Sequence, residues 1–378
     1  MLRYRLTLIG AVAIAVSLTA CSSTSTSAQS IGDSNAAEGS LAAVCPATVV
    51  IQTDWYATPE RAAAYNLIGG QGEVDVNAGA YIGEIGDTGV TAEVRLGGPF
   101  IGGQPVTAQM YTDTSITLGL VATDVAVRDY EKFPTKAVVS PLVKSPQILM
   151  WDPTKFDVDN WDDIAGTGAP VLSSPGVSYV DYLEHVGLVT TEQLDGSFDG
   201  SPSRFVSEDG AIFQQGYVSN EPYRWENDVE EWSRPVESLL IDDAGYHPYP
   251  QAFSVRADDE DELAPCLEQL VPMIQQSQVD YMTDPEATNT AILNIAAQLR
   301  DGPPITAAGN ANSVEVQKTQ EIVANSPDGT LGSFDLERVD ELIVTLREVS
   351  AANGTEVPDD LDAPSIVTND YIDPSIIL

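Results

Sequence analysis

Basic residues are scarce in this chain of 378 residues. Lys and Arg number 17 against 57 Asp and Glu, which gives a formal net charge of −40. Nucleic acid is excluded as a partner, because a phosphate backbone requires a basic footprint. Adsorption on an anionic membrane surface is disfavoured for the same reason. Hydrophobic residues still make up 43%, which is enough for a sizeable core, divided between two or three domains or two lobes.

Cysteine and histidine are also rare, with three Cys and two His. His185 and His247 are far apart and far from the cysteines, so no spacing typical of a metal site is present, and we expect neither a metal nor a cofactor. A Ser-His hydrolase is disfavoured because the chain lacks a Gly-x-Ser-x-Gly motif. Catalysis by paired carboxylates stays open as an alternative, because Asp and Glu are abundant.

The one long apolar run lies near the N-terminus, at 6–20, and follows two arginines. It is too short to span a bilayer comfortably, which predicts a secretory signal peptide over 1–20. The run ends in Leu-Thr-Ala-Cys, which resembles the bacterial lipobox and implies that Cys21 is lipidated. The Ser- and Thr-rich stretch after it predicts a flexible tether over 21–44. We therefore expect an extracytoplasmic protein, lipid-anchored to the outer face of the bacterial cell membrane. An ordinary signal peptide cleaved nearby is the alternative.

The other two cysteines form an even pair. If Cys21 carries lipid, Cys45 and Cys266 remain in an oxidising compartment, where a disulfide between them is the default expectation. The alternative is a pair of buried free thiols.

Strand and helix patterns alternate over the first hundred or so residues after the tether. Three short apolar runs predict buried strands, at 47–53, 91–96 and 116–121. Helix signals lie between them, which indicates a parallel α/β sheet. Two further extended segments, 137–143 and 147–151, are expected to pair with each other.

A second α/β unit is predicted within 141–252, inserted into the first. Its clearest elements are a helix at 178–185 and a strand at 211–218. The C-terminal third is predicted to be helical, because apolar residues recur there at helical spacing. Acidic residues mark the expected helix starts at 258–262 and at Asp335.

Several short motifs, taken in order, resemble the solute-binding lipoproteins of ABC importers. They are Gln-Thr-Asp-Trp-Tyr at 52–56, Trp-Asp-Asp-Ile-Ala-Gly at 161–166 and Gly-Tyr-Val-Ser-Asn-Glu-Pro-Tyr at 216–223. The resemblance is to the branch that binds sulfonates, nitrate or thiamine pyrimidines, and is greatest to the thiamine-pyrimidine side. A related eukaryotic branch makes the pyrimidine with a His and a Cys-rich segment. This chain has no Cys cluster, so we expect a binding protein and not an enzyme.

The resemblance implies a type II periplasmic-binding-protein fold. In that fold two α/β lobes are joined by two crossover segments, and the ligand lies in the cleft between them. The first lobe would comprise 45–140 and, with the C-terminal helices, 253–378, and the second lobe 141–252. A membrane permease and its ATPase are the implied partners. We expect the receptor itself to be a monomer.

Ligands of open α/β sheets bind beyond the carboxyl ends of the strands, close to helix N-termini. Strand-end loops supply most of the candidate ligand-binding residues, which are Asp54, Trp55, Tyr56, Asp124, Ser173, Ser174, Gly176, Asn220, Glu221 and Tyr223, with His247 near the second crossover. The aromatic rings can stack on a planar ligand, and the carboxylates can bond its amino groups. The loop at 173–178 can hold an acidic group on its N–H groups. The alternatives are structural roles such as helix capping, turns, core packing and hinge contacts.

A cleft bordered by Asp54, Asp124 and Glu221 disfavours small anions. We therefore predict a small nitrogenous heterocycle, similar to a thiamine pyrimidine, as the ligand. The alternative is an aliphatic sulfonate, taurine or nitrate. Such an anion would need a cation in the cleft, and Arg224 and Arg95 are the nearest candidates in the sequence. Two other classes stay open, a secreted enzyme and a surface lipoprotein that binds nothing small.

Overall fold

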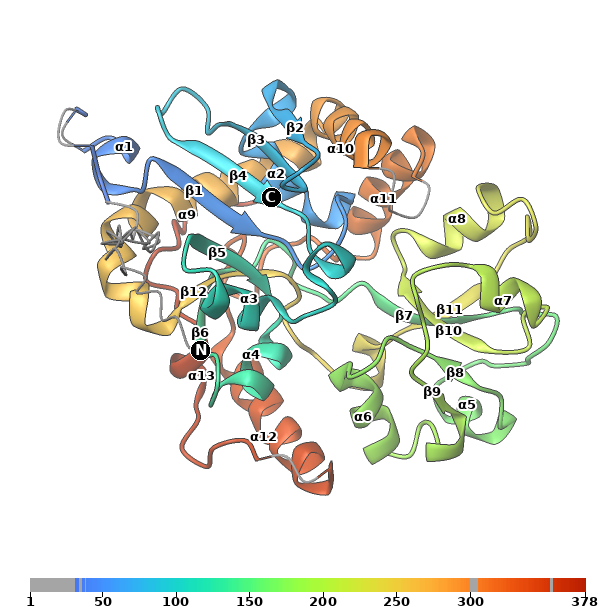
Figure 1. Cartoon of the computed structure of the whole chain (residues 1–378). Helices are drawn as coiled ribbons and strands as arrows, with labels where there is room; N and C mark the ends of the chain where they lie inside the picture. Colours follow the sequence, from blue (N-terminus) through green and yellow to red (C-terminus); the bar gives the residue numbers. More distant parts are fainter. Residues whose placement is uncertain (1–30, 34–35, 38, 300–304, 354–355) are drawn as a thin grey trace, which may run out of the picture.

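The computed structural model describes residues 31–33, 36–37, 39–299, 305–353 and 356–378. The predicted signal peptide, the predicted lipidation site Cys21 and the first part of the predicted tether lie outside the described residues. The described chain forms two α/β lobes, each built around its own β-sheet (Figure 1). This confirms the two-lobed α/β architecture expected from the sequence.

The first lobe contains a seven-stranded sheet with the strand order β2-β3-β4-β1-β5-β12-β6. Its strands are β1 (Thr48–Gln52), β2 (Glu73–Asp75), β3 (Ala80–Glu84), β4 (Thr91–Arg95), β5 (Ile116–Val121), β6 (Thr135–Val139) and β12 (Ala252–Arg256). β1 pairs in parallel with β4 and β5, whereas β12 runs antiparallel to β5 and β6. β1 is buried on both faces, which explains its unbroken run of Val49, Val50 and Ile51. Because β1 and β5 are parallel, the loops that follow them lie at the same edge of the sheet.

The second lobe contains a five-stranded sheet with the order β11-β7-β10-β8-β9. Its strands are β7 (Gln147–Trp151), β8 (Val171–Leu172), β9 (Leu194–Asp195), β10 (Phe213–Tyr217) and β11 (Glu237–Leu240). The predicted pairing of 137–143 with 147–151 is wrong. β6 pairs with β12 in the large sheet, and β7 pairs with β10 and β11 in the small one. The intervening residues carry the chain from one sheet to the other, so these two strands cannot form a hairpin.

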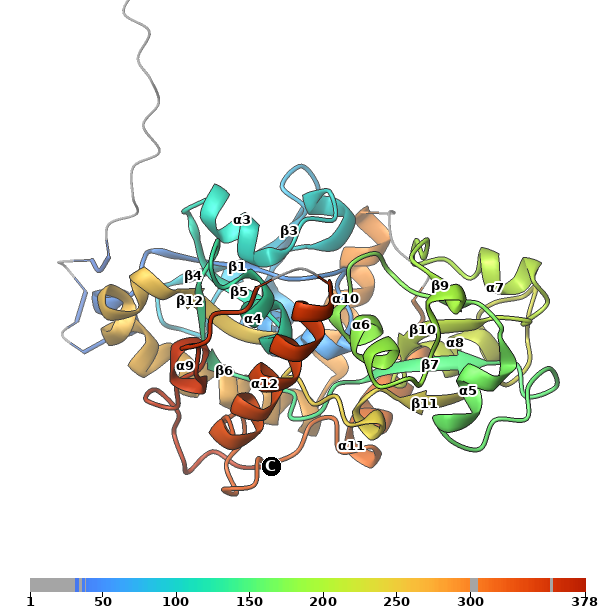
Figure 2. The same ribbon diagram turned by 90° about the horizontal axis from the view of Figure 1, so that it is seen from below.

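Helices cover both sheets. In the first lobe they are α1 (Leu41–Val44), η1 (Pro59–Arg61), α2 (Ala62–Asn66), η2 (Gly69–Gln71), η3 (Gly98–Ile101), α3 (Val106–Thr112), α4 (Thr123–Asp129), η6 (Ala257–Asp259), α9 (Glu260–Thr283), α10 (Glu286–Leu299), α11 (Ala307–Thr319), α12 (Leu336–Asn353) and α13 (Ala363–Ile366). In the second lobe they are α5 (Asp162–Thr167), α6 (Ser178–His185), η4 (Thr191–Gln193), α7 (Ser203–Ser207), α8 (Glu221–Asn227) and η5 (Asp242–Ala244). α12 packs against both α4 and α6, so this helix spans the junction between the lobes (Figure 2).

Two helix predictions agree closely with the structure. The helix expected at 178–185 is α6, with the same bounds. The start of α12 is capped by Asp335, as its acidic character predicted. The Asp335 Oδ1 atom accepts hydrogen bonds from the backbone N–H groups of Glu337 and Arg338, at 3.0 and 3.3 Å. None of the helices among the described residues is long and apolar enough to cross a bilayer.

The predicted disulfide between Cys45 and Cys266 is present. It joins the residue after α1 to the long helix α9, and both cysteines are fully buried. The bond closes a sequence separation of 221 residues. Cys45 precedes β1, so the disulfide lies near the opposite end of that strand from the loop that carries Asp54 and Trp55.

Candidate ligand-binding cleft

A cleft between the lobes consists of two adjoining compartments. The inner compartment has a volume of about 240 Å³ and lies between the Asp54–Arg61 segment of the first lobe and the β10–α8 segment of the second. The outer compartment has a volume of about 700 Å³ and is lined by α4 and by the start of α6. Asp54, Gln147, Val177 and Tyr217 line both compartments.

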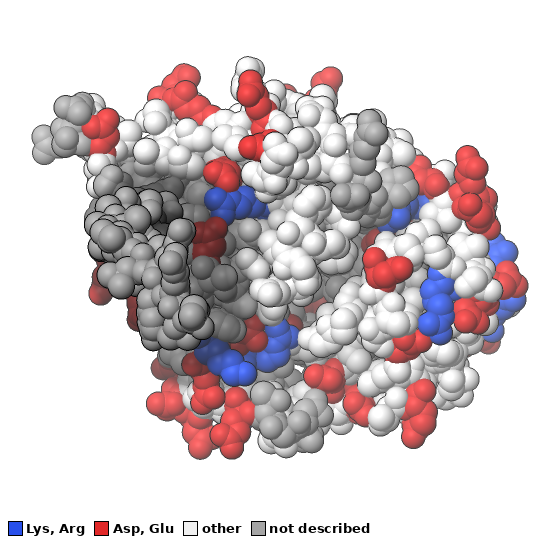
Figure 3. All heavy atoms as spheres, viewed as in Figure 1, with Lys and Arg blue, Asp and Glu red and all other residues white. Residues whose placement is uncertain are grey.

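Acidic side chains are spread over both lobes on the visible face and are not gathered at one place (Figure 3).

Asp54 lines the cleft, but its carboxylate is already paired. Arg61 Nε lies 2.7 Å from Asp54 Oδ1, and Arg61 Nη2 lies 2.8 Å from Asp54 Oδ2. Arg61 also donates to Thr58 Oγ1 at 2.9 Å and lies over the Tyr217 ring, 5.8 Å from its centroid. A bidentate pair of this kind occupies both oxygens of the carboxylate and neutralises its charge. Asp54 is therefore poorly placed to attract a ligand amine.

The two predicted aromatic residues point in different directions. Trp55 lines the inner compartment, and its ring lies so close to Gly98 that a Cβ atom there would be 2.7 Å from Trp55 Cε3. Gly98 also has a φ of +59°, so this position requires glycine on two counts. Tyr56 instead packs against the core of the first lobe, edge-on to Phe100 with ring centroids 5.7 Å apart. Tyr56 is not among the residues that line either compartment.

The loop after β8 contributes residues with different roles. Ser173 is buried, and its backbone binds Asp195 and Phe198 within the second lobe. Ser174 lines the inner compartment, where its N–H donates to Gln215 Oε1 at 2.6 Å and its hydroxyl accepts from Gln215 Nε2 at 3.1 Å. Gly176 lines the outer compartment, and its carbonyl accepts from Arg128 Nη1 at 2.9 Å.

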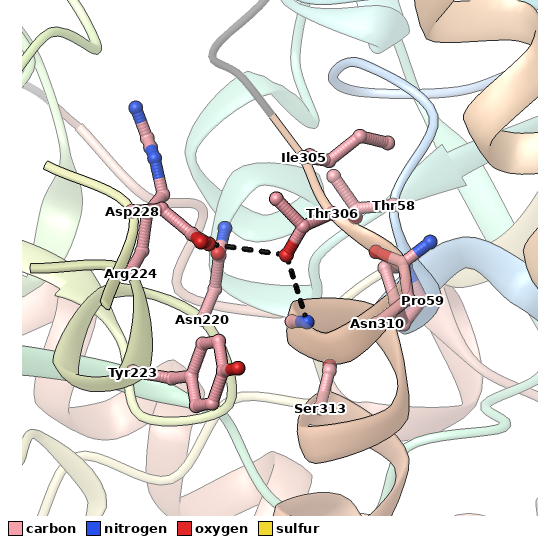
Figure 4. A pocket seen from close by; sticks show the side chains of 11 residues that line it. Thr58, Pro59, Asn220, Tyr223, Arg224, Asp228, Ile305, Thr306, Asn310 and Ser313 are labelled. Carbon is pink, nitrogen blue, oxygen red and sulfur yellow. Dashed lines mark hydrogen bonds between the residues drawn. The ribbon is translucent and has the colours of Figure 1, made fainter. Parts of the chain in front are cut away.

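The segment after β10 brings Asn220 and Glu221 into the inner compartment. Glu221 Oε2 accepts a hydrogen bond from the Tyr217 N–H at 2.6 Å, and Glu221 Oε1 lies 3.7 Å from Arg224 Nη1. Burial raises the pKa of Glu221, although Arg224 and the Tyr217 N–H act in the opposite direction. Tyr223 points elsewhere and lines a small notch between α8 and α11, which is drawn in Figure 4.

Arg224 on α8 is a buried cation in the wall of the cleft, which Arg61 and Arg128 also line. It lines both the inner compartment and the notch, and only 2% of its surface is exposed. Its Nε and Nη2 atoms are buried and have no hydrogen-bond partner in the protein. Burial lowers the pKa of Arg224, with Glu221 and Asp228 opposing the shift. Arg95, the other cation considered from the sequence, binds Glu93 and Asp113 and lines neither compartment.

Asp124 lies buried in the wall of the outer compartment. Its Oδ2 atom accepts from the Tyr246 hydroxyl at 2.9 Å, and its Oδ1 atom accepts from the Val125 N–H at 2.9 Å. The helix start expected at Thr123 and Asp124 is present, but Ala122 occupies the N-cap position and α4 begins at Thr123. His247 is exposed, with its Nδ1 atom 3.0 Å from Asp242 Oδ1, and lines neither compartment.

Glu60, which no sequence pattern singled out, is one of the most deeply buried carboxylates among the described residues. Glu60 is 2% exposed and lines the inner compartment. It lies in the first turn of η1, where an acidic residue is ordinarily found at the protein surface, so its burial was not expected. Its Oε1 atom accepts from Ser219 of the second lobe at 2.5 Å and from Ser313 on α11 at 3.0 Å. Its Oε2 atom has no partner in the protein. Within the described residues, no cluster of three or more His, Cys, Asp or Glu is arranged to hold a metal ion.

Several polar contacts bridge the lobes beside the cleft, among them the bond from Tyr246 to Asp124 described above. Besides Glu60 with Ser219, Arg128 on α4 donates to Gly176, and Thr306 before α11 donates to Asp228 on α8 at 3.2 Å (Figure 4). Together these contacts join the two lobes. We expect them to favour this arrangement over any form in which the lobes are further apart.

Replacing Ser219 with Ala is expected to loosen this arrangement. The variant loses a buried hydrogen bond to a charged group, and such bonds contribute about 1.5–3 kcal/mol. The ratio of closed to open molecules should fall roughly tenfold or more, and small-angle X-ray scattering of the unliganded protein should give a larger radius of gyration. Ser313→Ala is the control, because Ser313 bonds the same oxygen from within the lobe of Glu60. Equal scattering from the two variants would contradict the interpretation.

Because the carboxyl of Asp124 is buried, its contribution to the free energy of unfolding should depend on pH. Burial raises its pKa in the folded protein, with Arg128 and the Tyr246 hydroxyl opposing the shift. The resulting stabilisation is complete below the unfolded-state pKa of about 3.9 and is lost as the pH rises through the folded-state value. Asp124→Asn has no carboxyl to ionise, so its stability does not fall for this reason. The variant should therefore gain stability relative to the parent protein as the pH rises above about 4. Denaturant unfolding across pH tests this, with exposed Asp243→Asn as control. A stability difference that does not change with pH would refute it.

Comparison with known proteins shows the fold. The sequence matches no protein-family model and no curated protein. One similar solved structure is the alkanesulfonate-binding protein SsuA from Xanthomonas axonopodis pv. citri, bound to MOPS. The two proteins superpose with a TM-score of 0.53 and share 12% sequence identity. The match covers 85% of this chain and 99% of SsuA. An ABC transporter protein from Parabacteroides distasonis superposes with a TM-score of 0.50 at 10% identity, over 83% of this chain and 97% of that one. The chain therefore has the fold of the periplasmic binding proteins.

Proposed function

We propose that this protein is the extracytoplasmic substrate-binding component of an ABC importer. It would capture a small molecule between its lobes and deliver it to a membrane permease driven by an ATPase. The two-lobed fold and the cleft support this role, and the Leu-Thr-Ala-Cys segment at 18–21 supports a lipid anchor through Cys21. We further propose the division of the lobes expected from the sequence, with 141–252 as the second lobe, and a monomeric receptor.

The observation that carries the ligand class is the buried guanidinium of Arg224 in the inner compartment, whose Nε and Nη2 atoms have no hydrogen-bond partner and whose nearest carboxylate, that of Glu221, is 3.7 Å from Nη1. A buried charge whose hydrogen bonds are incomplete is costly, so its retention favours a ligand group that accepts the remaining bonds. Sulfonate and carboxylate oxygens are suitable acceptors for a guanidinium. By contrast, Asp54 and Glu221, which would bind ring amines, already accept hydrogen bonds from the protein. The geometry thus favours an acidic ligand, such as an aliphatic sulfonate, over the predicted pyrimidine. The solved Xanthomonas protein is named as an alkanesulfonate binder.

A nitrogenous heterocycle is the second candidate. Trp55 lines the inner compartment and offers a ring face for stacking. The Gln215 side chain lies in the same compartment and can exchange its bond with Ser174 for one with a ring nitrogen. Catalysis through paired carboxylates receives less support, because Asp54 and Glu221 are both engaged by protein donors.

A thermal-shift screen of the full-length protein in detergent tests the proposal. The panel contains aliphatic sulfonates, taurine, nitrate, thiamine and hydroxymethyl-pyrimidine. A ligand that binds only the native state stabilises it by about 2.7 kcal/mol at a concentration of 100 times Kd. We expect sulfonates to raise the melting temperature. Stabilisation by pyrimidines alone would favour the second candidate, and no stabilisation by any compound would argue against a transport receptor for these ligand classes.

A further inference from the structure

The amide of Gln215, on β10 in the wall of the inner compartment, is held in one orientation. Its Oε1 atom accepts hydrogen bonds from the Ser174 N–H at 2.6 Å and from the Tyr179 hydroxyl at 3.0 Å. Because a backbone N–H can only donate, the amide atom that faces Ser174 N must be the oxygen. The structure therefore fixes which end of this amide is oxygen and which is nitrogen.

The nitrogen of the same amide is only half used by the protein. Nε2 donates to Ser174 Oγ at 3.1 Å, which is its only hydrogen bond within the described residues. An amide nitrogen carries two hydrogens, so one N–H of Gln215 remains for a group in the compartment. Since the oxygen already accepts two bonds, Gln215 offers that group a donor and no free acceptor.

Tyr179 supports this orientation from behind. It lies in the first turn of α6, is 6% exposed and packs in the core of the second lobe. Burial raises the pKa of Tyr179, and the nearby Tyr217 adds to the shift, so the hydroxyl of Tyr179 is protonated at neutral pH and donates. Reversal of the amide would lose this bond to Oε1 together with the bond from Ser174.

We propose that Gln215 determines specificity in the inner compartment by donating its free N–H to an acceptor atom of the ligand, with Tyr179 as the positioning residue. This inference rests on the proposed receptor function and deepens it. Arg224, on the same lobe, supplies charge and unbonded donors, and Gln215 adds a neutral donor that faces the same compartment. The ligand therefore carries at least two acceptor atoms, as a sulfonate does. A ring amine at Gln215 would place N–H against N–H and is disfavoured.

Titration calorimetry of the full-length protein with ethanesulfonate and 1-hexanesulfonate tests the inference. Gln215→Met removes the donor and should weaken binding by about 10- to 100-fold, as expected for a lost hydrogen bond to a charged group. Gln147→Met is the matched control. Gln147 lines the same compartment, but its Nε2 atom already donates to the Gly216 carbonyl at 3.0 Å. This control should change the affinity by no more than about threefold.

Gln215→Glu separates hydrogen bonding from charge. Its carboxyl keeps an acceptor for Ser174 and Tyr179, repels a sulfonate when ionised, and donates to it when protonated. As the pH falls from about 8 to about 4.5, the variant should come to bind at least about tenfold more tightly than Gln215→Met, because both side chains are then neutral but only the carboxyl donates. The other titratable groups of the compartment are common to both variants, so their effects cancel: Asp54, Glu60, Arg61, Tyr217, Glu221 and Arg224.

Tyr179→Phe tests the positioning role with the packing of the ring preserved. It should weaken sulfonate binding by about three- to tenfold in the parent protein and have no further effect in Gln215→Met, because Tyr179 acts through the amide. An equal loss in both backgrounds would show that Tyr179 acts through packing and not through Gln215.

The outcomes separate this inference from the receptor function. If Gln215→Met binds the sulfonates as tightly as the unmodified protein, the inference is wrong and the proposed function stands. If neither sulfonate binds the unmodified protein at millimolar concentration, the acidic-ligand receptor and the inference are both rejected. If Gln215→Met does not fold, Gln215→Glu is compared with Gln147→Glu at neutral pH, since both add a carboxylate to the same compartment. Equal affinities of these two variants would overturn the assignment of Gln215 to the ligand.

Discussion

Arg224→Met is expected to abolish binding of the acidic ligand while leaving the unliganded protein at least as stable as before. Truncating one partner of a buried, hydrogen-bonded charge pair costs about 2–5 kcal/mol, which is about 30- to 3,000-fold in affinity. The same substitution removes a guanidinium that is 2% exposed and has two unbonded nitrogens. Removing the guanidinium also removes its desolvation cost. Glu221, which loses the cation 3.7 Å away, can become neutral by taking up a proton, because burial already raises its pKa. Calorimetry with a sulfonate and thermal unfolding without ligand measure the two effects.

The control for this prediction is Arg204→Met. Arg204 lies on α7 of the same lobe, is 42% exposed, and pairs with Asp195 and Glu208 away from the cleft. We expect this variant to keep the affinity for the ligand. A large fall in the melting temperature of unliganded Arg224→Met would show that Arg224 is needed for folding, and retained affinity in that variant would remove Arg224 from the ligand site.

Loss of the disulfide between Cys45 and Cys266 is expected to produce the largest effect on stability. The bond closes a sequence separation of 221 residues and ties the segment before β1 to α9. Removal of a native disulfide typically costs about 2–5 kcal/mol, largely through the entropy of the unfolded chain. For a protein of this size, a loss of this order should lower the melting temperature by about 3–6 °C. Thermal unfolding of the Cys45→Ala, Cys266→Ala double variant measures the effect.

Ligand affinity should be unchanged in the double variant, because the disulfide lies near the far end of β1 from Trp55 and Arg61. Unmodified protein treated with a reductant should approach the melting temperature of the variant. An unchanged melting temperature after complete reduction would show that the packing of α1 against α9 holds this region without the covalent bond.

The fold was predictable where hydrophobic patterns are long and regular. The apolar runs of β1 and β5 and the helical spacing of α12 reflect burial against a continuous core, and such burial leaves a clear pattern in the sequence. β2 and β11 were not predicted, because they are short and carry half-buried or exposed residues. The partners of β6 and β7 were mispredicted, since two extended segments separated by a few residues look the same whether they form a hairpin or cross between two sheets.

The candidate site was predictable as a set of loops but not as a set of contacts. The strand-end rule placed Trp55, Ser174, Asn220 and Glu221 in one compartment, although they come from both lobes. No local pattern revealed that Arg61 would pair with Asp54, or that Glu60 would be buried beside Ser219. Such pairings depend on how distant segments meet. They decide which charges remain available to a ligand, and for this reason the sequence alone favoured a nitrogenous ring.

Hydrogen exchange measured by mass spectrometry, with and without the most strongly stabilising ligand, tests the central claim most directly. The account predicts that one ligand slows exchange in both lobes at once, in peptides that cover 54–66 of the first lobe and 215–228 of the second. Peptides from the exposed face of α12 should not change. Protection confined to one lobe, or located away from the inner compartment, would contradict a ligand held between the two lobes.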